Sequence, residues 1–142
     1  MGAVPVDLRS DTMTRPSPAM RAAMAAAEVG DDCWGEDPTV NRLQEVMAER
    51  LGMEAGLFMP SSTMGNQVAV RVLTRPGTVV VAGRRQHLVA WENGAAAANS
   101  SVQFDQVDDR DGWWAAEALT GAVRDSGYHR PRVSLAAVED TH

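Results

Sequence analysis

Three polar clusters in this 142-residue chain contain the residue types that bind anions and transfer protons. The first is a hydroxyl-rich turn with Ser61, Ser62 and Thr63, the second is His87, and the third is the run Glu139-Asp140-Thr141-His142. A helix that begins after Ser61 or Ser62 would direct free backbone N–H groups and its positive end at one spot. Such a spot binds phosphate or another anion. An ordinary capped helix produces the same pattern and remains the alternative.

The two histidines of these clusters, His87 and His142, are candidates for proton transfer because imidazole titrates near neutral pH without special perturbation. For His87 taken alone, a hydrogen-bonded surface histidine is the plainer interpretation. The single cysteine, Cys33, cannot form an internal disulfide. We interpret it as structural or incidental rather than as a nucleophile.

Patterns typical of strands and helices alternate along the chain. Short apolar runs predict strands at residues 56–59, 78–82 and 133–138, and alternating polar and apolar residues predict one at residues 101–107. Apolar residues at helical spacing predict helices at residues 19–28, 38–51, 64–73 and 112–124. Ser17 and Asp37 are the expected N-caps of the first two helices, and Gly30 is expected to end the first one. Residues 86–99 are ambiguous, because Asn93 and Gly94 interrupt an alanine run that otherwise favours a helix.

Strands that alternate with helices and are apolar on both faces favour an α/β fold. We expect three layers, α/β/α, around a mainly parallel sheet, with the last strand covered on both faces. Ligands of such sheets bind outside the carboxyl ends of the strands. Each polar cluster directly follows a predicted strand, so we expect all three to meet at one edge of the sheet.

Composition limits the function classes. The net charge of −6 offers no basic patch for nucleic acid, and we expect no nucleic-acid partner. No apolar run approaches the roughly 20 residues that cross a bilayer, so we expect no membrane partner. The start of the chain does not resemble a secretory signal, and one cysteine suits a reducing compartment; we expect a cytoplasmic protein. All 13 basic residues are arginine, and no lysine is present.

Several motifs together resemble a known family. They are Asp7-Leu8-Arg9-Ser10-Asp11-Thr12, Gly30-Asp31-Asp32, the segment 35–41, the segment 61–67, His87 with Glu92-Asn93-Gly94, and the segment 139–142. In this order they resemble the threonine aldolases, which belong to the aromatic amino acid beta-eliminating lyase/threonine aldolase group of pyridoxal-phosphate-dependent enzymes. The resemblance implies the aspartate-aminotransferase fold (fold type I). It implies an N-terminal arm at residues 1–15 and a partial large domain of the pyridoxal-phosphate-dependent transferase fold at residues 16–142.

The resemblance also implies roles for particular residues. Ser62 and Thr63 would hold the phosphate of pyridoxal 5′-phosphate, and His87 would lie against the pyridine ring and act in catalysis. Ser10 would contact the substrate carboxylate. His142 would lie near the substrate hydroxyl, where removal of the proton starts cleavage. No metal is implied.

Two acidic segments, Asp31-Asp32 and residues 35–41, would line the entrance or reach a neighbouring subunit's site. Enzymes of this family cleave L-threonine or allo-threonine to glycine and acetaldehyde, so the implied partner is a small amino acid. The full-length protein would be a homodimer or homotetramer. Related beta-eliminating activity on another amino acid stays open.

The match departs from the family pattern at several positions. Ser62 replaces a usual glycine, Trp34 and Trp91 replace smaller aromatic residues, and Asp140 replaces asparagine. In the family, the lysine that bonds to the cofactor lies downstream of the segment equivalent to 139–142, and arginine cannot replace it because guanidinium stays protonated.

We therefore expect this chain to be an N-terminal portion that is inactive by itself. The alternative is a non-catalytic, truncated remnant that acts at most in anion binding or oligomer contacts. A nucleotide-binding module is disfavoured, because no glycine-rich nucleotide motif is present.

Overall fold

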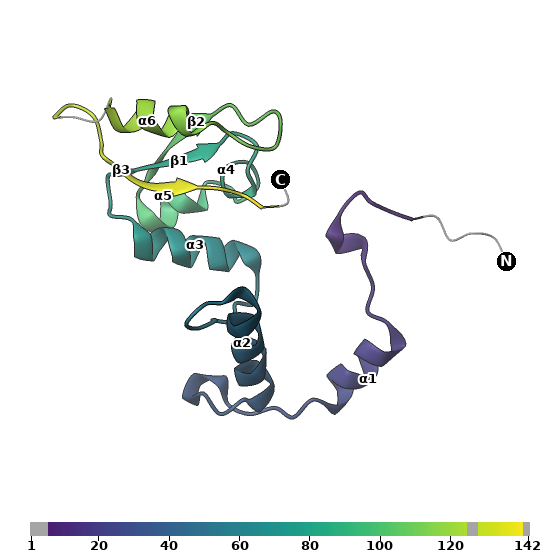
Figure 1. The fold of residues 1–142 in the computed structure, drawn as a ribbon. Helices are drawn as coiled ribbons and strands as arrows, with labels where there is room; N and C mark the ends of the chain where they lie inside the picture. Colours follow the sequence, from purple (N-terminus) through teal and green to yellow (C-terminus); the bar gives the residue numbers. More distant parts are fainter. Residues whose placement is uncertain (1–5, 125–127, 141–142) are drawn as a thin grey trace. The chain divides into compact units, whose positions relative to one another are not determined.

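The computed structural model describes residues 6–124 and 128–140, and the chain divides into two units, residues 1–58 and 59–142 (Figure 1). The predicted boundary between an arm and a domain at residues 15 and 16 stays a prediction. Across the described residues, none of the helices combines the length and the apolar character that a membrane-crossing helix needs.

The first unit contains two α-helices, α1 (Pro18–Ala26) and α2 (Pro38–Leu51), and two short 3₁₀ helices, η1 (Asp11–Met13) and η2 (Asp32–Trp34). The predicted N-caps are confirmed. Ser17 Oγ accepts a hydrogen bond from the Met20 amide at the start of α1, and Asp37 caps α2 ahead of Pro38. The prediction that Gly30 ends α1 is wrong, because α1 already ends at Ala26 and Ala27 is extended.

The predicted strand at residues 56–59 does not form, and these residues are a loop. Leu57 and Phe58 are exposed, so the apolar run is not buried. The loop lies against α2: the Phe58 amide donates to Gln44 Oε1 at 2.8 Å. A Cβ at Gly56 would come within 2.8 Å of the Gln44 carbonyl oxygen. The segment therefore satisfies this backbone donor with a helix side chain, whereas a strand needs a neighbouring strand.

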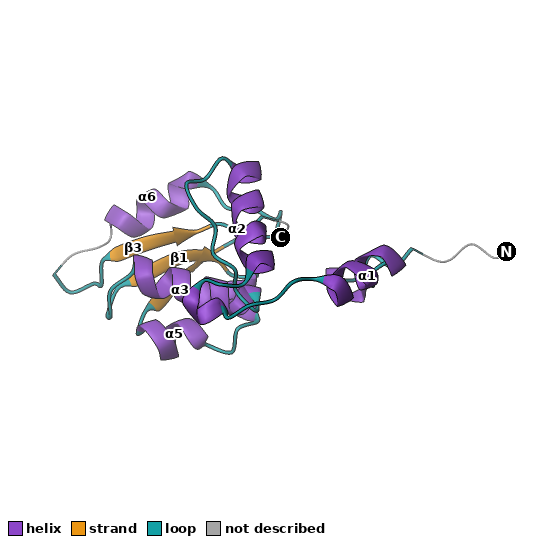
Figure 2. Ribbon diagram, turned by 90° about the horizontal axis from the view of Figure 1, so that it is seen from below, coloured by secondary structure: helices purple, strands orange, loops and turns teal. Residues whose placement is uncertain are grey.

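The second unit contains a three-stranded parallel sheet with strand order β2-β1-β3. Its elements, in chain order, are α3 (Ser62–Leu73), β1 (Val79–Gly83), α4 (His87–Ala90), α5 (Ala95–Ser100), β2 (Gln103–Val107), α6 (Ala116–Arg124) and β3 (Val133–Ala137). Figures 1 and 2 show α6 on one face of the sheet and α3 with α5 on the other. The predicted α/β fold with a parallel sheet in three layers is confirmed, and the ambiguous segment 86–99 forms two short helices separated by a turn.

The core is centred on β1, all five residues of which are buried. Val80 is paired in register with Phe104 of β2 and Leu135 of β3. Val70 of α3 and Ala96 of α5 belong to the same apolar cluster. Apolar side chains on three strands therefore meet two helices on this face, which is the ordinary way that a parallel sheet is covered.

The prediction that the last strand is covered on both faces is wrong. Residues of β3 alternate between half-buried and exposed, and Ser134 and Ala136 are exposed. Within the described residues, β3 pairs with β1 alone and is an edge strand. An apolar sequence run by itself does not distinguish an edge strand from a central one.

The carboxyl ends of all three strands lie at one edge, because Gly83 pairs with Val107 and Ala82 with Ala137. Asp109, just after β2, is only 2% exposed, and its Oδ2 accepts a hydrogen bond of 2.8 Å from the Arg85 amide. A Cβ at Gly83 would come within 2.8 Å of Asp109 Cγ. Glycine at the end of β1 therefore allows this carboxylate to reach the loop that leads to His87.

Replacing Gly83 with alanine should destabilise the protein by about 1–3 kcal/mol, the usual cost of overpacking a filled site. The matched control is Gly121→Ala in α6, where a Cβ would meet nothing within 4 Å. That change should be neutral or stabilise by about 0.5–1 kcal/mol, because alanine favours a helix over glycine. Urea unfolding followed by circular dichroism measures both variants. Equal midpoints for the two would contradict the close packing of Gly83 against Asp109.

Candidate functional site

The helix α3 begins at the hydroxyl-rich turn, as the sequence predicts. Ser61 is extended, and its Oγ accepts a hydrogen bond of 3.1 Å from the Met64 amide. Ser62 and Thr63 are the first two residues of the helix, where backbone N–H groups have no intrahelical acceptor. Within the described residues, no acceptor for these two amides is present. The helix end thus offers two amides and two hydroxyls to an anion.

The predicted convergence of the second and third clusters is confirmed at the level of His87 and Glu139. The His87 backbone amide donates to the Glu139 carboxylate, at 3.0 Å to Oε1 and 3.1 Å to Oε2. Its neighbour Gln86 is buried, and Gln86 Nε2 donates to the Ala137 carbonyl at 3.2 Å. Hydrogen bonds from His87 and Gln86 therefore attach the loop after β1 to the end of β3.

The first cluster is joined to His87 through Glu92. Asn66, which lies one turn after Ser62 on the same face of α3, donates from Nδ2 to Glu92 Oε1 at 2.7 Å. Gln67 donates from Nε2 to Glu92 Oε2 at 2.6 Å. His87 Nδ1 lies 2.9 Å from Glu92 Oε1. The carboxylate thus brings the imidazole and the N-terminal half of α3 together.

The electrostatics of Glu92 result from two opposing effects. Burial is the larger single effect and raises the pKa, because desolvation disfavours the charged form. Hydrogen bonds from Asn66, His87 and Gln67, together with attraction to His87, lower the pKa and outweigh burial. The pKa of Glu92 therefore lies below its ordinary value, and the group is a carboxylate at neutral pH.

A cleft of about 280 Å³ lies at this edge of the sheet. Its lining residues are Asn66, Gln86, Leu88, Ala137, Val138, Glu139 and Asp140. The cleft thus draws on α3, on the loop and helix after β1, and on the end of β3. Its position outside the carboxyl ends of parallel strands is where ligands of such sheets bind.

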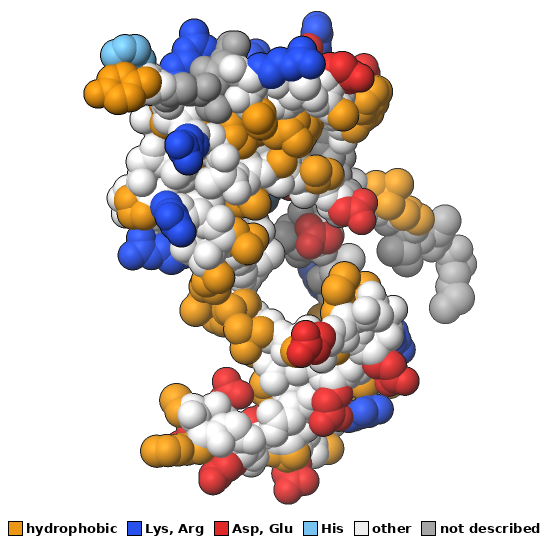
Figure 3. Space-filling view, turned by 60° about the vertical axis from the view of Figure 1, so that its left-hand side comes forward, with side chains coloured by type: hydrophobic (Ala, Val, Ile, Leu, Met, Phe, Trp, Pro, Cys, Tyr) orange, Lys and Arg blue, Asp and Glu red, His pale blue; other side chains and the backbone are white. Residues whose placement is uncertain are grey.

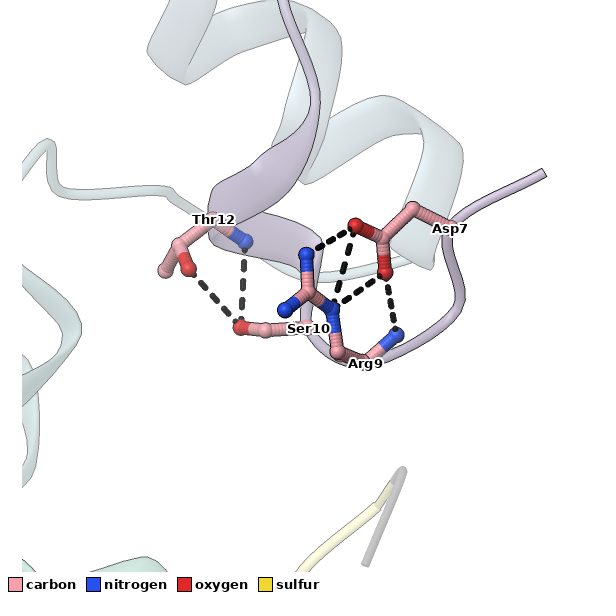
Figure 4. Close-up of polar contacts among 4 residues, drawn as sticks. All are labelled: Asp7, Arg9, Ser10 and Thr12. Atoms are coloured by element: carbon pink, nitrogen blue, oxygen red, sulfur yellow. Dashed lines mark hydrogen bonds and ion pairs between the residues drawn. The ribbon is translucent and has the colours of Figure 1, made fainter. Parts of the chain in front are cut away.

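Ser10 belongs to the first unit, where it is the N-cap of η1 (Figure 4). Its Oγ lies 2.9 Å from Thr12 Oγ1 and accepts a hydrogen bond of 3.2 Å from the Thr12 amide. Beside it, Arg9 donates to the Asp7 carboxylate from Nε and Nη2. These contacts lower the pKa of Asp7 below its usual value. The Ser10 hydroxyl is exposed and held locally; a role in binding substrate stays a prediction.

The loop before α2 is organised by Asp37. Its Oδ1 accepts hydrogen bonds from the Thr39 and Val40 amides, at 3.0 and 2.9 Å, and its Oδ2 accepts one of 3.1 Å from the Gly30 amide. A Cβ at Gly30 would come within 2.7 Å of the Glu36 carbonyl carbon. Gly30 is therefore a close-approach position rather than a helix end, and one buried carboxylate closes the loop from residue 30 to residue 37.

Comparison with known proteins identifies the family. A family model described as beta-eliminating lyase matches residues 7–142. The chain belongs to the beta-eliminating lyase family. It is 45% identical over 141 residues to low-specificity L-threonine aldolase 1 of Arabidopsis thaliana, which covers 96% of this chain and 39% of that protein. It is 41% identical over 138 residues to low specificity L-threonine aldolase of Escherichia coli (strain K12), covering 96% of this chain and 41% of that protein.

The chain therefore spans about two fifths of the length of these two relatives. The expected membership of the threonine aldolase group, as an N-terminal portion, is confirmed. The expected catalytic and binding roles of individual residues are a separate matter and stay predictions.

Among the residues predicted for this lyase site, the structure places Ser62, Thr63 and His87 in one unit and links α3 to His87. His142 lies outside the described residues. Asp109 has no place in the sequence-based interpretation. Asn66, Gln67 and Glu92 appear there only as members of motifs, without a role of their own. The one sequence signal for Glu92 is its place before Asn93-Gly94, a pair that is typical of a left-handed turn.

Substitution of Asp37 should make stability less dependent on pH. Hydrogen bonds from the Val40 and Gly30 amides lower the pKa of Asp37, burial opposes them, and the Thr39 amide adds to the lowering. A lowered pKa stabilises the fold above the unfolded value of about 3.9, and this stability is lost as the pH falls through the lower folded value. Asp37→Asn should therefore have a lower urea midpoint than the parent at pH 7, and the difference should shrink in acid.

The control is Asp32→Asn, in the same loop. Asp32 is exposed, and its carboxylate accepts no hydrogen bond within the described residues. The urea midpoint of Asp32→Asn should stay close to that of the parent from pH 7 into acid. A difference between Asp37→Asn and the parent that persists unchanged in acid would refute the role given to the Asp37 carboxylate.

Proposed function

We propose that this chain forms the cofactor-binding part of a pyridoxal-phosphate-dependent aldehyde-lyase that resembles L-threonine aldolase. The reaction is cleavage of threonine or allo-threonine to glycine and acetaldehyde. One observation carries the proposal: the hydrogen bonds of Glu92 bring His87 to the N-terminal half of α3 in a chain 41–45% identical to low-specificity threonine aldolases.

The start of α3 fits a phosphate group. The amides of Ser62 and Thr63 have no acceptor among the described residues, and both hydroxyls add possible donors. A phosphate with two negative charges needs several such donors, and the positive end of the helix dipole favours it. The Ser62 side chain is exposed, so a Cβ at this position does not fill the space above the helix end.

His87 fits the role of a ring that lies against the cofactor. Its side chain is 48% exposed although Nδ1 is held by Glu92 and the backbone amide by Glu139. The ring is therefore anchored and still accessible. When bound, pyridoxal phosphate supplies the electron sink for the negative charge left on the substrate α-carbon.

Two further residues complete the proposed chemistry. Ser10 would donate its hydroxyl proton to the substrate carboxylate. His142 would accept the proton of the substrate hydroxyl, because a histidine titrates in the range that a general base needs. The substrate, on this proposal, is a small amino acid.

The covalent attachment of the cofactor must come from residues other than these 142. No lysine is present, and the 13 arginines cannot act as nucleophiles near neutral pH. The chain by itself should therefore bind the cofactor without cleaving substrate.

Association into a homo-oligomer is also proposed. Figure 3 shows hydrophobic side chains exposed on the surface. Met47, Leu51 and Phe58 of the first unit are 42%, 64% and 47% exposed. Exposed apolar groups at this density are typical of surfaces that another chain covers. A cytoplasmic location without nucleic-acid or membrane partners stays our prediction.

Ser62→Pro should weaken binding of pyridoxal 5′-phosphate by about tenfold or more, because it deletes an amide and a hydroxyl that would contact the phosphate. Proline is well tolerated at the first helical position, and the extended backbone of Ser61 suits a following proline. The control Ser62→Ala deletes the hydroxyl alone and should lose less affinity. Titration followed by absorbance, repeated with pyridoxal lacking phosphate, measures the effect. Equal affinity of Ser62→Pro and the parent would exclude a phosphate site at this helix end.

The 142-residue chain, mixed with pyridoxal 5′-phosphate and L-threonine or L-allo-threonine, should release acetaldehyde no faster than free cofactor does. The physical reason is the lack of an amine side chain for covalent attachment. A coupled alcohol dehydrogenase assay follows acetaldehyde through NADH absorbance. Release well above the free-cofactor control would refute the assignment of covalent chemistry to residues outside this chain.

A further inference from the structure

Glu92 is a carboxylate in an environment that normally excludes charge. Its side chain is fully buried, with 0% of its surface exposed, while the adjacent Trp91 is 73% exposed. The usual preference, in which the aromatic residue is inside and the acid outside, is reversed here. Burial of a charge is costly unless partners compensate it. The reversal therefore calls for a specific reason.

The backbone turns sharply directly after Glu92. Asn93 and Gly94 are both left-handed, with φ of 51° and 71°. Two consecutive left-handed residues turn the chain between α4 and α5, and Asn and Gly are the residues that tolerate this conformation best. The Glu92 side chain lies against His87 and α3.

Inside the fold, the Glu92 carboxylate is in contact with three side chains that donate hydrogen bonds. Asn66 Nδ2 and His87 Nδ1 share Oε1, at 2.7 and 2.9 Å, and Gln67 Nε2 contacts Oε2 at 2.6 Å. An ionised carboxylate can only accept hydrogen bonds. Each partner must therefore present a hydrogen, including the imidazole.

This requirement determines the protonation of His87. A neutral imidazole carries one proton, on Nδ1 or on Nε2. Because Nδ1 faces an atom that can only accept, Nδ1 carries the proton and Nε2 has the free lone pair. The same hydrogen bond restrains rotation of the ring, while the hydrogen bond from the His87 amide to Glu139 restrains its backbone.

We propose that Glu92 is a positioning residue for His87: it fixes the proton on Nδ1, holds the ring orientation and ties the imidazole to the start of α3. The meaning of this arrangement for catalysis rests on the proposed function. The tautomer and the ring orientation do not, because they follow from contacts within the chain. Carboxylates that orient histidines at metal sites contribute about 10- to 100-fold in affinity, which gives the scale for such an effect.

The test is nitrogen-15 NMR of the histidine rings in the chain without cofactor, at a pH where imidazole is neutral. The parent chain should show His87 with the proton on Nδ1. In Glu92→Leu the side chain accepts no hydrogen bond from Nδ1, so His87 should shift toward the tautomer with the proton on Nε2. His129 serves as the internal reference, because it is exposed and its ring contacts Tyr128.

Two results would overturn the proposal: a proton on Nε2 of His87 in the parent chain, or an unchanged tautomer in Glu92→Leu. The measurement on the parent needs no variant, so it stays decisive if Glu92→Leu fails to fold. Asn66→Ala is the matched variant, since it removes one donor from Glu92 but keeps the carboxylate; His87 should retain the proton on Nδ1.

Cofactor binding gives the second readout. Glu92→Leu should weaken pyridoxal 5′-phosphate binding by roughly tenfold, on the scale seen for partners that orient a histidine. Ser62→Pro should weaken binding as well but leave the His87 tautomer unchanged. If the parent chain has the predicted tautomer and binds no cofactor, the proposed function fails while the positioning role of Glu92 stands.

Discussion

Carboxylates that accept hydrogen bonds from the strand-end loops are the interactions on which the rest of the site depends. Asp109 accepts a hydrogen bond from the Arg85 amide, and Glu139 accepts one from the His87 amide. Glu92 is hydrogen-bonded to the His87 ring. Each acid comes from a different place in the chain, after β2, after β3 and after α4. The loop after β1 and the start of α4 are therefore held by three separate segments, so their conformation depends on the assembled sheet.

This arrangement couples the central strand to the site. All five residues of β1 are buried, and β1 lies between the two other strands. Its last residue is a glycine because Asp109 occupies the space that a side chain would need. The packing of the core and the geometry of the site therefore depend on the same strand, because β1 forms the centre of the core and its last residue packs against the Asp109 carboxylate.

Local signals in the sequence predicted the helix starts well. Ser17, Asp37 and Ser61 accept hydrogen bonds from the first-turn amides, because capping depends on a few neighbouring residues. The order of strands and helices, and hence the meeting of His87 and Glu139 at one edge, was predictable for the same reason. The prediction of a strand at residues 56–59 was wrong, because an apolar run forms a strand only when it pairs with another strand.

The role of Glu92 could not be predicted from local sequence patterns, for a different reason. An acid in a motif with Asn93-Gly94 looks like a solvated turn, and only the tertiary structure shows that Asn66 and Gln67, some 25 residues earlier, provide its donors. Propensities describe neighbours in sequence, whereas the burial of a charge depends on distant partners. Polar networks of this kind are where sequence reasoning about a fold is expected to fail, and they coincide with functional sites.

Cofactor binding and covalent attachment of the cofactor need different groups, and none of these 142 residues is a lysine. In the proposed function, binding of the cofactor uses the amides and hydroxyls at the start of α3 and the ring of His87 in α4. Covalent chemistry needs a neutral amine, which guanidinium cannot replace because it holds its proton near neutral pH. The donors at α3 and the carboxylate under His87 require no lysine for their own geometry. On the proposed function, the geometry of the binding site is independent of the covalent bond that completes the chemistry, and the two can be measured separately.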